Sequence, residues 1–117
     1  MERALRNPRF LERVYGAQER AELMKKTGRR RVQSAAAAFA AKEAFAKAMG
    51  TGVRGFRLGE VQLLHDGQGA PYLRLSGGAE RLCGGRRLSV SVTHTARYAA
   101  AVVAAYDYRD GTDSIGF

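Results

Sequence analysis

The spacing of hydrophobic residues along this chain changes from a helical repeat in the first half to short strand-like runs in the second. Phe10, Leu11 and Val14 recur at the spacing of an amphipathic helix. Asn7 precedes a proline, which is typical of a helix start, because the asparagine side chain caps free amides and proline has none to leave unsatisfied. A first helix is therefore predicted after Asn7, with an interruption at Gly16.

A second helix is predicted over residues 17–26. Its expected buried side carries Ala21 and either Leu23 or Met24. The overlapping stretch 25–31 is dominated by Lys and Arg. We expect that stretch to be a basic loop.

Residues 34–49 form the strongest predicted helix of the chain. The segment is rich in alanine, which has the highest helix propensity, and Gly50 supplies a C-terminal stop. Many alanines leave a smooth surface that neighbouring elements can approach closely. We therefore expect this helix to be mostly buried.

Short strand-like runs dominate the second half. Residues 60–64 and 71–75 flank a turn over 65–69 whose Asp-Gly pair is a good hairpin signal. Between residues 88 and 93, apolar side chains alternate with Ser and Thr, which indicates a half-buried strand. The apolar run 98–106 is its expected antiparallel partner.

The remaining segments have weaker signals. The Gly-rich segment 76–87 is expected to be a short helix or a loop, and the tail 107–117 is expected to be loosely held. Helices first and strands later predict an α+β fold, with helices packed on an antiparallel sheet. At 117 residues, a single domain over residues 1–117 is expected.

The charge of the chain points to an anionic partner. Twenty Lys and Arg against eleven Asp and Glu give a net charge of +9, which attracts polyanions or acidic proteins. Nucleic acid, a phosphate-rich cofactor and an acidic protein all remain open on charge alone. A nucleic-acid-binding protein has no further support, because the aromatic residues are not interleaved with the arginine clusters.

Cysteine content and hydropathy limit the cellular location. The single cysteine, Cys83, rules out an internal disulfide framework and fits a reducing compartment. The N-terminus lacks the apolar core of a signal peptide, and no apolar stretch is long enough to span a bilayer. A cytoplasmic protein without a membrane segment is expected.

The first candidate for chemistry is the pair Glu43 and Lys47 on the alanine-rich helix. Their i,i+4 spacing, with the acid first, is favoured for a surface ion pair worth about 0.3–0.5 kcal/mol. On spacing alone, that structural explanation is the better one. The functional alternative is that this carboxylate and ammonium, just before the Gly-Thr-Gly turn, hold a divalent metal and a phosphate together.

The second candidate is His94, which is flanked by Thr93 and Thr95 at the end of a predicted strand. A lone histidine in this setting is most often a loop residue hydrogen-bonded to its neighbours. No second histidine or cysteine stands at metal-ligand spacing, so zinc is not expected. As a cluster of donors, one imidazole and two hydroxyls suit a phosphate.

The third candidate is a basic face on the first helices. Such arginine runs are usually solvated surface, and the alternative is a docking site for an acidic partner. The residues concerned are Arg6, Arg9, Arg13 and Arg20.

The order of these features resembles one protein family. PRFLER, then FAAKEAFAKAMGTG, then DGQGAPYL, then SVTHTARYAAAVV are similar to the holo-(acyl-carrier-protein) synthases of the 4'-phosphopantetheinyl transferase superfamily. The likeness covers residues 7–106 and implies that family's α+β fold. It also implies an Mg²⁺-dependent reaction in fatty acid biosynthesis. In that reaction a carrier-protein serine attacks the β-phosphate of coenzyme A and 3',5'-ADP is released.

The resemblance also assigns roles to residues. Glu43 matches the glutamate that binds Mg²⁺, Lys47 matches the lysine at the transferred phosphate, and Lys42 is a weaker candidate for assistance. Both Glu43 and Lys47 are thus candidate catalytic residues. The resemblance implies that coenzyme A is bound by Lys47, by the turn after the helix and by the loop at His94. The residues of the turn and the loop are Gly50, Thr51, Gly52, His94 and Thr95.

Partners and assembly follow from the same resemblance. The basic helix that family members use to grip acidic acyl carrier proteins corresponds to Arg6, Arg9 and Arg13. Members of this type form homotrimers with active sites between neighbouring subunits. No nucleic acid and no membrane are implied as partners.

The chain departs from the family pattern in two places. Family members begin with a strand of the type G-I-G-x-D, whose aspartate is the second Mg²⁺ ligand, and Met1 falls downstream of it. Ala38 stands where an arginine is usual. Aspartates elsewhere do not match that strand and are not assigned its role: Asp66, Asp107, Asp110 and Asp113.

Two explanations of the absent strand are open. Either this chain starts late relative to the family pattern, or it is a variant with weakened metal binding. The first is favoured, because losing a central strand exposes unpaired backbone groups. The alternative function is accordingly a catalytically impaired module that binds coenzyme A or a carrier protein.

Overall fold

The computed structural model describes residues 1–107 and 113–117. Two short 3₁₀ turns, η1 and η2, accompany four helices and five strands in the described residues. The helical elements are η1 (Ala4–Arg6), α1 (Pro8–Val14), α2 (Ala17–Met24), α3 (Gly28–Met49), η2 (Leu58–Glu60) and α4 (Gly77–Cys83). The strands are β1 (Val61–His65), β2 (Pro71–Leu75), β3 (Arg87–His94), β4 (Ala99–Tyr106) and β5 (Asp113–Gly116).

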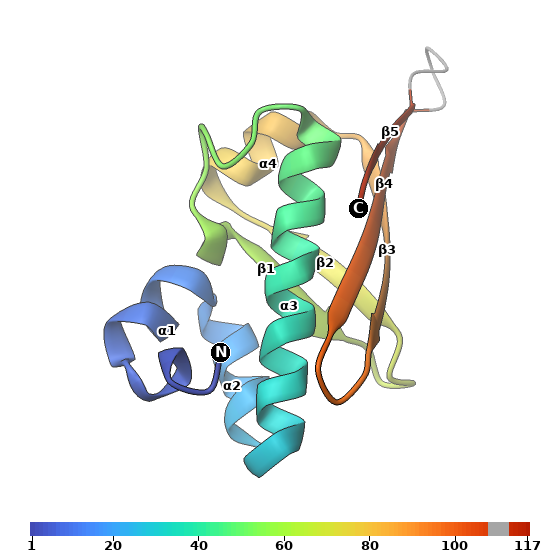
Figure 1. The fold of residues 1–117 in the computed structure, drawn as a ribbon. Helices are drawn as coiled ribbons and strands as arrows, with labels where there is room; N and C mark the ends of the chain where they lie inside the picture. Colours follow the sequence, from blue (N-terminus) through green and yellow to red (C-terminus); the bar gives the residue numbers. More distant parts are fainter. Residues whose placement is uncertain (108–112) are drawn as a thin grey trace.

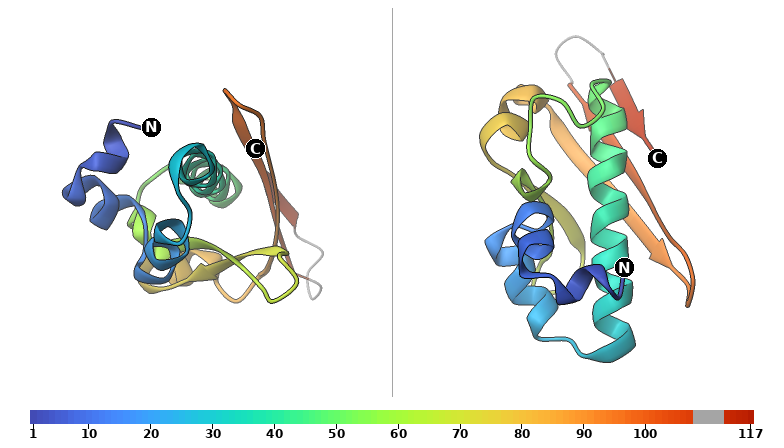
Figure 2. Two further views of the ribbon diagram at one scale, coloured as in Figure 1. Left: turned by 90° about the horizontal axis from the view of Figure 1, so that it is seen from below. Right: turned by 60° about the vertical axis from the view of Figure 1, so that its left-hand side comes forward.

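Helix α3 is the axis of the molecule, and the other elements surround it (Figure 1). The N-terminal helices lie on one side of α3, the β3–β4–β5 sheet lies on the other, and the β1–β2 hairpin closes a third side (Figure 2). This arrangement confirms the α+β prediction of helices packed on antiparallel strands.

The first helix begins as predicted. The side-chain oxygen of Asn7 accepts a 3.0 Å hydrogen bond from the backbone N–H of Arg9, which satisfies one free donor of α1. Val14 is buried. The predicted stripe of Phe10, Leu11 and Val14 therefore faces the core, with the first two side chains half-buried.

The buried side of α2 differs in part from the prediction. Leu23 is buried as expected, whereas Ala21 and Met24 are exposed. Glu19, one turn before Leu23, is buried on the same face of the helix. Of the two alternatives Leu23 and Met24, the structure selects Leu23. The prediction was wrong at Ala21, because a carboxylate with buried partners takes a place that hydrophobicity alone would give to an apolar residue.

The prediction that residues 25–31 are a loop was wrong over 28–31, because α3 begins at Gly28. The guanidinium of Arg31 donates to the carbonyl oxygens of Leu23, Met24 and Lys26. The carbonyls of Leu23 and Met24 lie in the last turn of α2, and that of Lys26 lies in the connection after it, so these bonds tie Arg31 to the end of α2. At its other end α3 stops at Gly50, with a φ of 74°, as predicted.

The expected burial of α3 is confirmed in its second half, where alanines allow close approach. A Cβ atom on Gly116 of β5 would overlap the carbonyl oxygen of Ala44. Strand β5 therefore lies directly on the helix backbone. The buried residues of α3 are Ala35, Ala37, Ala38, Ala41, Lys42, Ala44, Phe45, Ala46 and Ala48.

Both predicted strand pairs are present. Strands β1 and β2 pair antiparallel from Val61↔Leu75 to His65↔Pro71. Strands β3 and β4 pair from Arg87↔Tyr106 to His94↔Ala99. In β3, the apolar side chains are half-buried and the Ser and Thr side chains are exposed, as their alternation predicts.

The prediction of a loosely held tail was wrong over residues 113–116, which form strand β5. Strand β5 pairs with β4 from Val103↔Gly116 to Tyr106↔Asp113. Asp110 lies outside the described residues. Among the residues that the structure describes, no helix is long and apolar enough to cross a membrane.

Candidate active site

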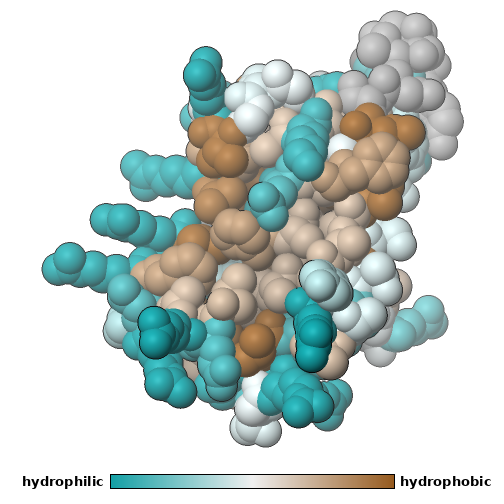
Figure 3. All heavy atoms as spheres, viewed as in Figure 1, coloured by the Kyte–Doolittle hydropathy of each residue, from teal (hydrophilic) through white to brown (hydrophobic). Residues whose placement is uncertain are grey.

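Glu43 and Lys47 project from the second half of α3, and both side chains are exposed. The surface ion pair suggested by their spacing does not form: within the described residues, neither side chain has an ion-pair or hydrogen-bond partner. In the space-filling view, hydrophilic side chains stand out from a largely apolar surface over the middle of the molecule (Figure 3). A carboxylate and an ammonium are thus available together on one face of one helix.

The turn after α3 brings backbone close to that face. Gly50 and Gly52 have φ values of 74° and 59°, a left-handed conformation that glycine adopts without strain. The Thr51 hydroxyl donates a 3.0 Å hydrogen bond to the carbonyl oxygen of Gly52. A cation at Lys47 and exposed backbone in the following turn suit a phosphate.

The donor set at this face limits how a metal is held. Over residues 1–107 and 113–117, no group of three or more His, Cys, Asp or Glu side chains is placed to hold a metal ion. Mg²⁺ usually binds one or two carboxylates together with substrate phosphates and water. The residues therefore fit an Mg²⁺ ion held chiefly by a ligand's phosphates, to which Glu43 adds one carboxylate.

His94 and Thr95 lie at the tip of the β3–β4 hairpin, on a small cavity of about 110 Å³. The Thr95 side-chain oxygen accepts hydrogen bonds from the N–H groups of Arg97 and Tyr98, at 3.3 and 3.1 Å. These bonds fix the turn. The imidazole of His94 is exposed beside it.

Within one chain, His94 and Glu43 lie beside different halves of α3. The cavity at His94 is lined from α3 by Val32, Gln33 and Ala36, in the first half of the helix. At a rise of about 1.5 Å per residue, Glu43 lies about 10 Å further along the axis than Ala36, and Lys47 about 16 Å further. Figure 1 shows the β3–β4 turn beside the N-terminal half of α3.

A basic cavity of about 600 Å³ adjoins the His94 cavity, with Val32 and Ala96 lining both. Arg6, Arg29 and Arg31 line it. Arg29 was missed as a site residue because it was placed in a featureless basic loop. Nothing in the sequence distinguishes Arg29 from the other basic residues of that stretch.

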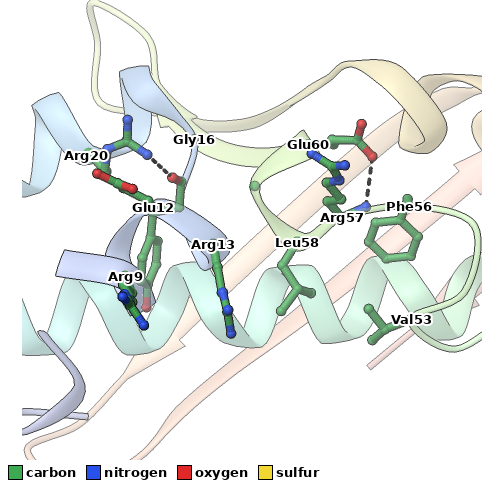
Figure 4. Close-up of a pocket in the computed structure, with 12 residues that line it drawn as sticks. Arg9, Glu12, Arg13, Gly16, Arg20, Val53, Phe56, Arg57, Leu58 and Glu60 are labelled. Atoms are coloured by element: carbon green, nitrogen blue, oxygen red, sulfur yellow. Dashed lines mark hydrogen bonds between the residues drawn. The ribbon is translucent and has the colours of Figure 1, made fainter. Parts of the chain in front are cut away.

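A second basic concavity, a groove of about 810 Å³, lies between the N-terminal helices and the segment leading to β1 (Figure 4). Arg9, Arg13 and Arg20 line one side of it. Arg20 donates a 2.8 Å hydrogen bond to the carbonyl oxygen of Tyr15. The opposite side, which sequence reasoning missed, consists of Val53, Phe56, Arg57, Leu58, Gly59 and Glu60.

The predicted basic face is therefore divided between two concavities. Arg9, Arg13 and Arg20 share the larger groove, whereas Arg6 lines the cavity next to His94. The groove exposes one apolar side chain, Val53, and its lining has four arginines against the two carboxylates of Glu12 and Glu60. Such a surface suits an acidic partner that also presents apolar side chains.

Lys42 does not contribute to the exposed face. Its side chain is fully buried, and its Nζ lies 2.6 Å from Oε1 of Glu19. Burial lowers the pKa of Lys42 and raises the pKa of Glu19, and in each residue the opposite charge of the partner counteracts the effect. The direct assisting role considered for Lys42 would require an ammonium that reaches a ligand, and this one is enclosed.

Several known proteins are similar to this chain in sequence and in fold. Residues 1–103 match the 4'-phosphopantetheinyl transferase superfamily. The holo-[acyl-carrier-protein] synthase of Listeria monocytogenes serotype 4a is 42% identical, over 84% of this chain and 80% of that protein. The enzyme of the same name from Chloroflexus aurantiacus is also 42% identical, over 84% and 82%.

Solved structures agree with these matches. The holo-(acyl-carrier-protein) synthase of Bacillus anthracis, in complex with CoA (3',5'-ADP), superposes with a TM-score of 0.76 at 30% identity, over 89% of this chain and 84% of that one. The Neisseria meningitidis enzyme gives 0.78 at 30% identity, over 91% and 90%. Sequence and fold together confirm the resemblance, and this chain belongs to the holo-(acyl-carrier-protein) synthase family of the 4'-phosphopantetheinyl transferase superfamily.

Proposed function

We propose that this protein transfers 4'-phosphopantetheine from coenzyme A to a serine of an apo acyl carrier protein, with Mg²⁺, in fatty acid biosynthesis. The serine hydroxyl oxygen bonds to the β-phosphorus, 3',5'-ADP leaves, and the hydroxyl proton passes to solvent. The observation that carries the proposal is the unpaired, exposed pair Glu43 and Lys47 beside the turn after α3. The buried free thiol of Cys83 fits a cytoplasmic location.

Phosphoryl transfer depends on positioning and on neutralising charge more than on covalent help from the protein. Lys47 would hold the β-phosphate and offset the negative charge that shifts to the leaving group. Glu43 would hold Mg²⁺ against the pyrophosphate; the ion, when bound, supplies further positive charge. The turn at Gly50 and Gly52 would admit the pyrophosphate close to the backbone.

Coenzyme A would extend from this face to the region of His94 and Thr95. The adjoining basic cavity, with Arg6 and Arg29, offers cations for the remaining phosphate of the nucleotide. Two relatives of known structure, from Bacillus anthracis and Helicobacter pylori, were solved in complex with this coenzyme or its ADP part. The cavity therefore supports binding of a polyphosphate ligand at this end of the molecule.

We propose that two copies of the chain complete such a site. Within one chain, His94 lies beside the first half of α3, while Glu43 and Lys47 lie on the second half. The family resemblance implies that a neighbouring subunit supplies the second part of the site. We propose a homotrimer in which the Glu43–Lys47 face of one subunit meets the His94 loop of the next.

The carrier protein would dock on the groove that contains Arg9 and Arg13. Its arginines complement an acidic helix, and the exposed side chain of Val53 offers an apolar contact. Arg6, predicted to share this role, lines the other cavity. We propose that Arg9 and Arg13 contact the carrier in the groove. Arg6 would contact the part of the carrier that lies toward His94.

Mass spectrometry of the carrier protein tests the proposal. Incubation with coenzyme A, Mg²⁺ and an apo carrier should add the mass of one phosphopantetheine group. Glu43→Gln and Lys47→Met should each lower kcat by about 10²–10³-fold, as loss of one charge-stabilising group does. Glu80→Gln, an exposed glutamate on α4, is the matched control and should keep full activity. No added mass from the wild-type protein would refute the transferase.

The alternative is a module that binds coenzyme A or a carrier without turnover. It is favoured by one observation: the described residues contain no group of three or more His, Cys, Asp or Glu side chains that could hold a metal ion without a ligand's phosphates. Calorimetry with coenzyme A separates the two. Binding without any mass gain on the carrier selects the module, and mass gain selects the enzyme.

A further inference from the structure

A network of buried charges joins three elements underneath the candidate site. The ammonium of Lys42, on α3, donates to Oε1 of Glu19 on α2 at 2.6 Å and to the carbonyl oxygen of Val61 on β1. It also lies 5.3 Å from the centre of the Tyr15 ring, within range of a cation–π contact. Every side of this ammonium is occupied.

Both carboxylate oxygens of Glu19 accept hydrogen bonds as well. Its Oε1 accepts the N–H of Gly16 at 3.1 Å, and its Oε2 accepts the N–H of Leu63 at 2.8 Å. No buried side-chain nitrogen or oxygen among the described residues lacks a hydrogen-bond partner. The pair therefore bonds α3, the start of α2 and β1 to one another at a single point.

The network is placed to control both halves of the site. In a helix each residue turns by about 100°, so Glu43 and Lys47 lie at about 100° and 140° around the axis from Lys42. Fixing the direction of Lys42 fixes the face that carries both. Tyr15 and Gly16, which contact the pair, also line the arginine groove.

We infer that Lys42 is a positioning residue, which with Glu19 sets the rotation of α3 so that Glu43 and Lys47 keep a fixed orientation relative to the arginine groove. It acts without touching a ligand. Its effect on turnover rests on the proposed function, whereas its effect on the orientation of α3 rests on the hydrogen bonds alone.

Stability by itself does not account for a buried pair of this kind. Removing two charges from water costs about as much as their attraction returns, and apolar replacement of both partners is often neutral. Directional bonds to Val61, Leu63 and Gly16 give what an apolar contact lacks, namely one defined angle between α3 and its neighbours. Orientation and stability are therefore separable by experiment.

The test variant replaces both partners, as Glu19→Gln with Lys42→Met. The glutamine oxygen still accepts one of the two backbone N–H groups, of Gly16 or Leu63, that the carboxylate of Glu19 accepts. The variant leaves no charge unpaired and gives up one hydrogen bond to the backbone. A single Lys42→Met variant is avoided because it would bury a lone carboxylate. The matched control is Glu22→Gln with His65→Gln, which removes the half-exposed 2.9 Å pair that also links α2 to β1 but does not reach α3.

Hydrogen exchange provides a readout that needs no activity. In the double variant, we expect amides over residues 42–48 to exchange at least about tenfold faster, while β3 and β4 amides keep wild-type rates. The control should match wild type throughout. Wild-type exchange over 42–48 in the folded double variant would overturn the inference, whatever the enzyme does.

Kinetics provide the second readout. In the folded double variant, kcat should fall by about 10- to 100-fold, as for a small misplacement of reacting groups. KM for coenzyme A and the shape of the pH profile should stay unchanged. A general loss of structure would change KM, and the loss of a titrating group would change the pH profile. If the wild-type protein is active and the double variant has the same kcat, the inference is contradicted. If the wild-type protein is inactive, the proposed function is contradicted, and hydrogen exchange alone tests the inference.

Discussion

The hydroxyl of Tyr15 donates a 2.8 Å hydrogen bond to the carbonyl oxygen of Ala35, and both residues are fully buried. Tyr15 ends α1, and Ala35 lies in the first half of α3, so this bond anchors the helix that carries the arginines to the axis of the molecule. Edge contact with Phe10, at 6.1 Å between ring centres, holds the ring from the other side. The phenol of Tyr15 thus ties the end of α1 to α3, apart from the Lys42–Glu19 pair, which ties α2 to α3.

Replacing Tyr15 with Phe should destabilise the protein modestly at neutral pH. The ring and its packing remain, and only the hydrogen bond is lost, so the free energy of unfolding should fall by about 0.5–1.5 kcal/mol. Urea unfolding followed by circular dichroism measures this change. Tyr98→Phe, at a position that is 76% exposed, is the control and should unfold like wild type.

The same phenol should make the fold sensitive to alkali. Burial, reinforced by the negative charge of Glu19, raises the pKa of Tyr15 above its ordinary value near 10. Because the folded pKa exceeds the unfolded one, this contribution to stability is complete below about pH 10 and is lost as pH rises further. Unfolding free energies between pH 8 and 11 should fall more steeply for wild type than for Tyr15→Phe, and parallel curves would contradict this explanation.

Reversing the charge of Arg13 should weaken carrier binding more than catalysis. Arg13→Glu places a negative charge in the groove, so KM for an acidic carrier should rise at least about tenfold, with little change in kcat. The dependence of wild-type KM on salt should also become weaker in the variant. Steady-state assays at two ionic strengths measure both effects.

Arg74 offers the matched control for that variant. It is exposed on β2 and is not among the residues that line the groove. Arg74→Glu changes the net charge by the same amount as Arg13→Glu, so an equal rise in KM for both would show that only total charge matters.

Adding a methyl group to Gly116 should detach β5. A Cβ there would overlap the carbonyl oxygen of Ala44 and lie 2.7 Å from the nitrogen of Ala48, and both are backbone atoms that cannot move aside. Gly116→Ala should therefore cost about 1–3 kcal/mol. Faster hydrogen exchange of the β4 amides that face β5 should accompany the loss. Gly67→Ala, in an open turn with no atom within 4 Å, should have little effect on either measurement.

Local signals explain which parts of the fold could be predicted. The Asn7 cap, the Asp-Gly hairpin turn and the alternation in β3 act over a few residues, and all three elements are present. Strand β5 was missed because its stability comes from β4 and from Ala44, far away in sequence. A segment of four residues carries too little periodicity to show this.

The candidate site was predictable in composition but not in arrangement. Helical spacing places Glu43 and Lys47 on one face, whatever surrounds them. Lys and Glu are rarely buried, so nothing in the sequence signals that Lys42 would meet Glu19 in the core across 23 positions. The separation of His94 from Glu43 likewise depends on where the β3–β4 turn meets α3, which is a property of packing.

That separation leads to a prediction about assembly. If each site combines Glu43 and Lys47 of one subunit with His94 of its neighbour, Glu43→Gln and His94→Ala should each be nearly inactive alone. Co-refolding the two variants should restore activity, because some interfaces then pair an intact α3 face with an intact His94 loop. With random mixing of equal amounts, about one quarter of interfaces are intact, so turnover should approach about a quarter of the wild-type value.

Co-refolding Glu43→Gln with Lys47→Met is the control, since both changes fall on the same face and no interface regains both groups. If sites formed within single subunits, neither mixture would gain activity, and the two experiments would give the same low rate. Restoration in the first mixture but not in the second would require that His94 and the Glu43–Lys47 face act across a subunit boundary. Sedimentation of the mixed sample would then establish whether that boundary belongs to a trimer.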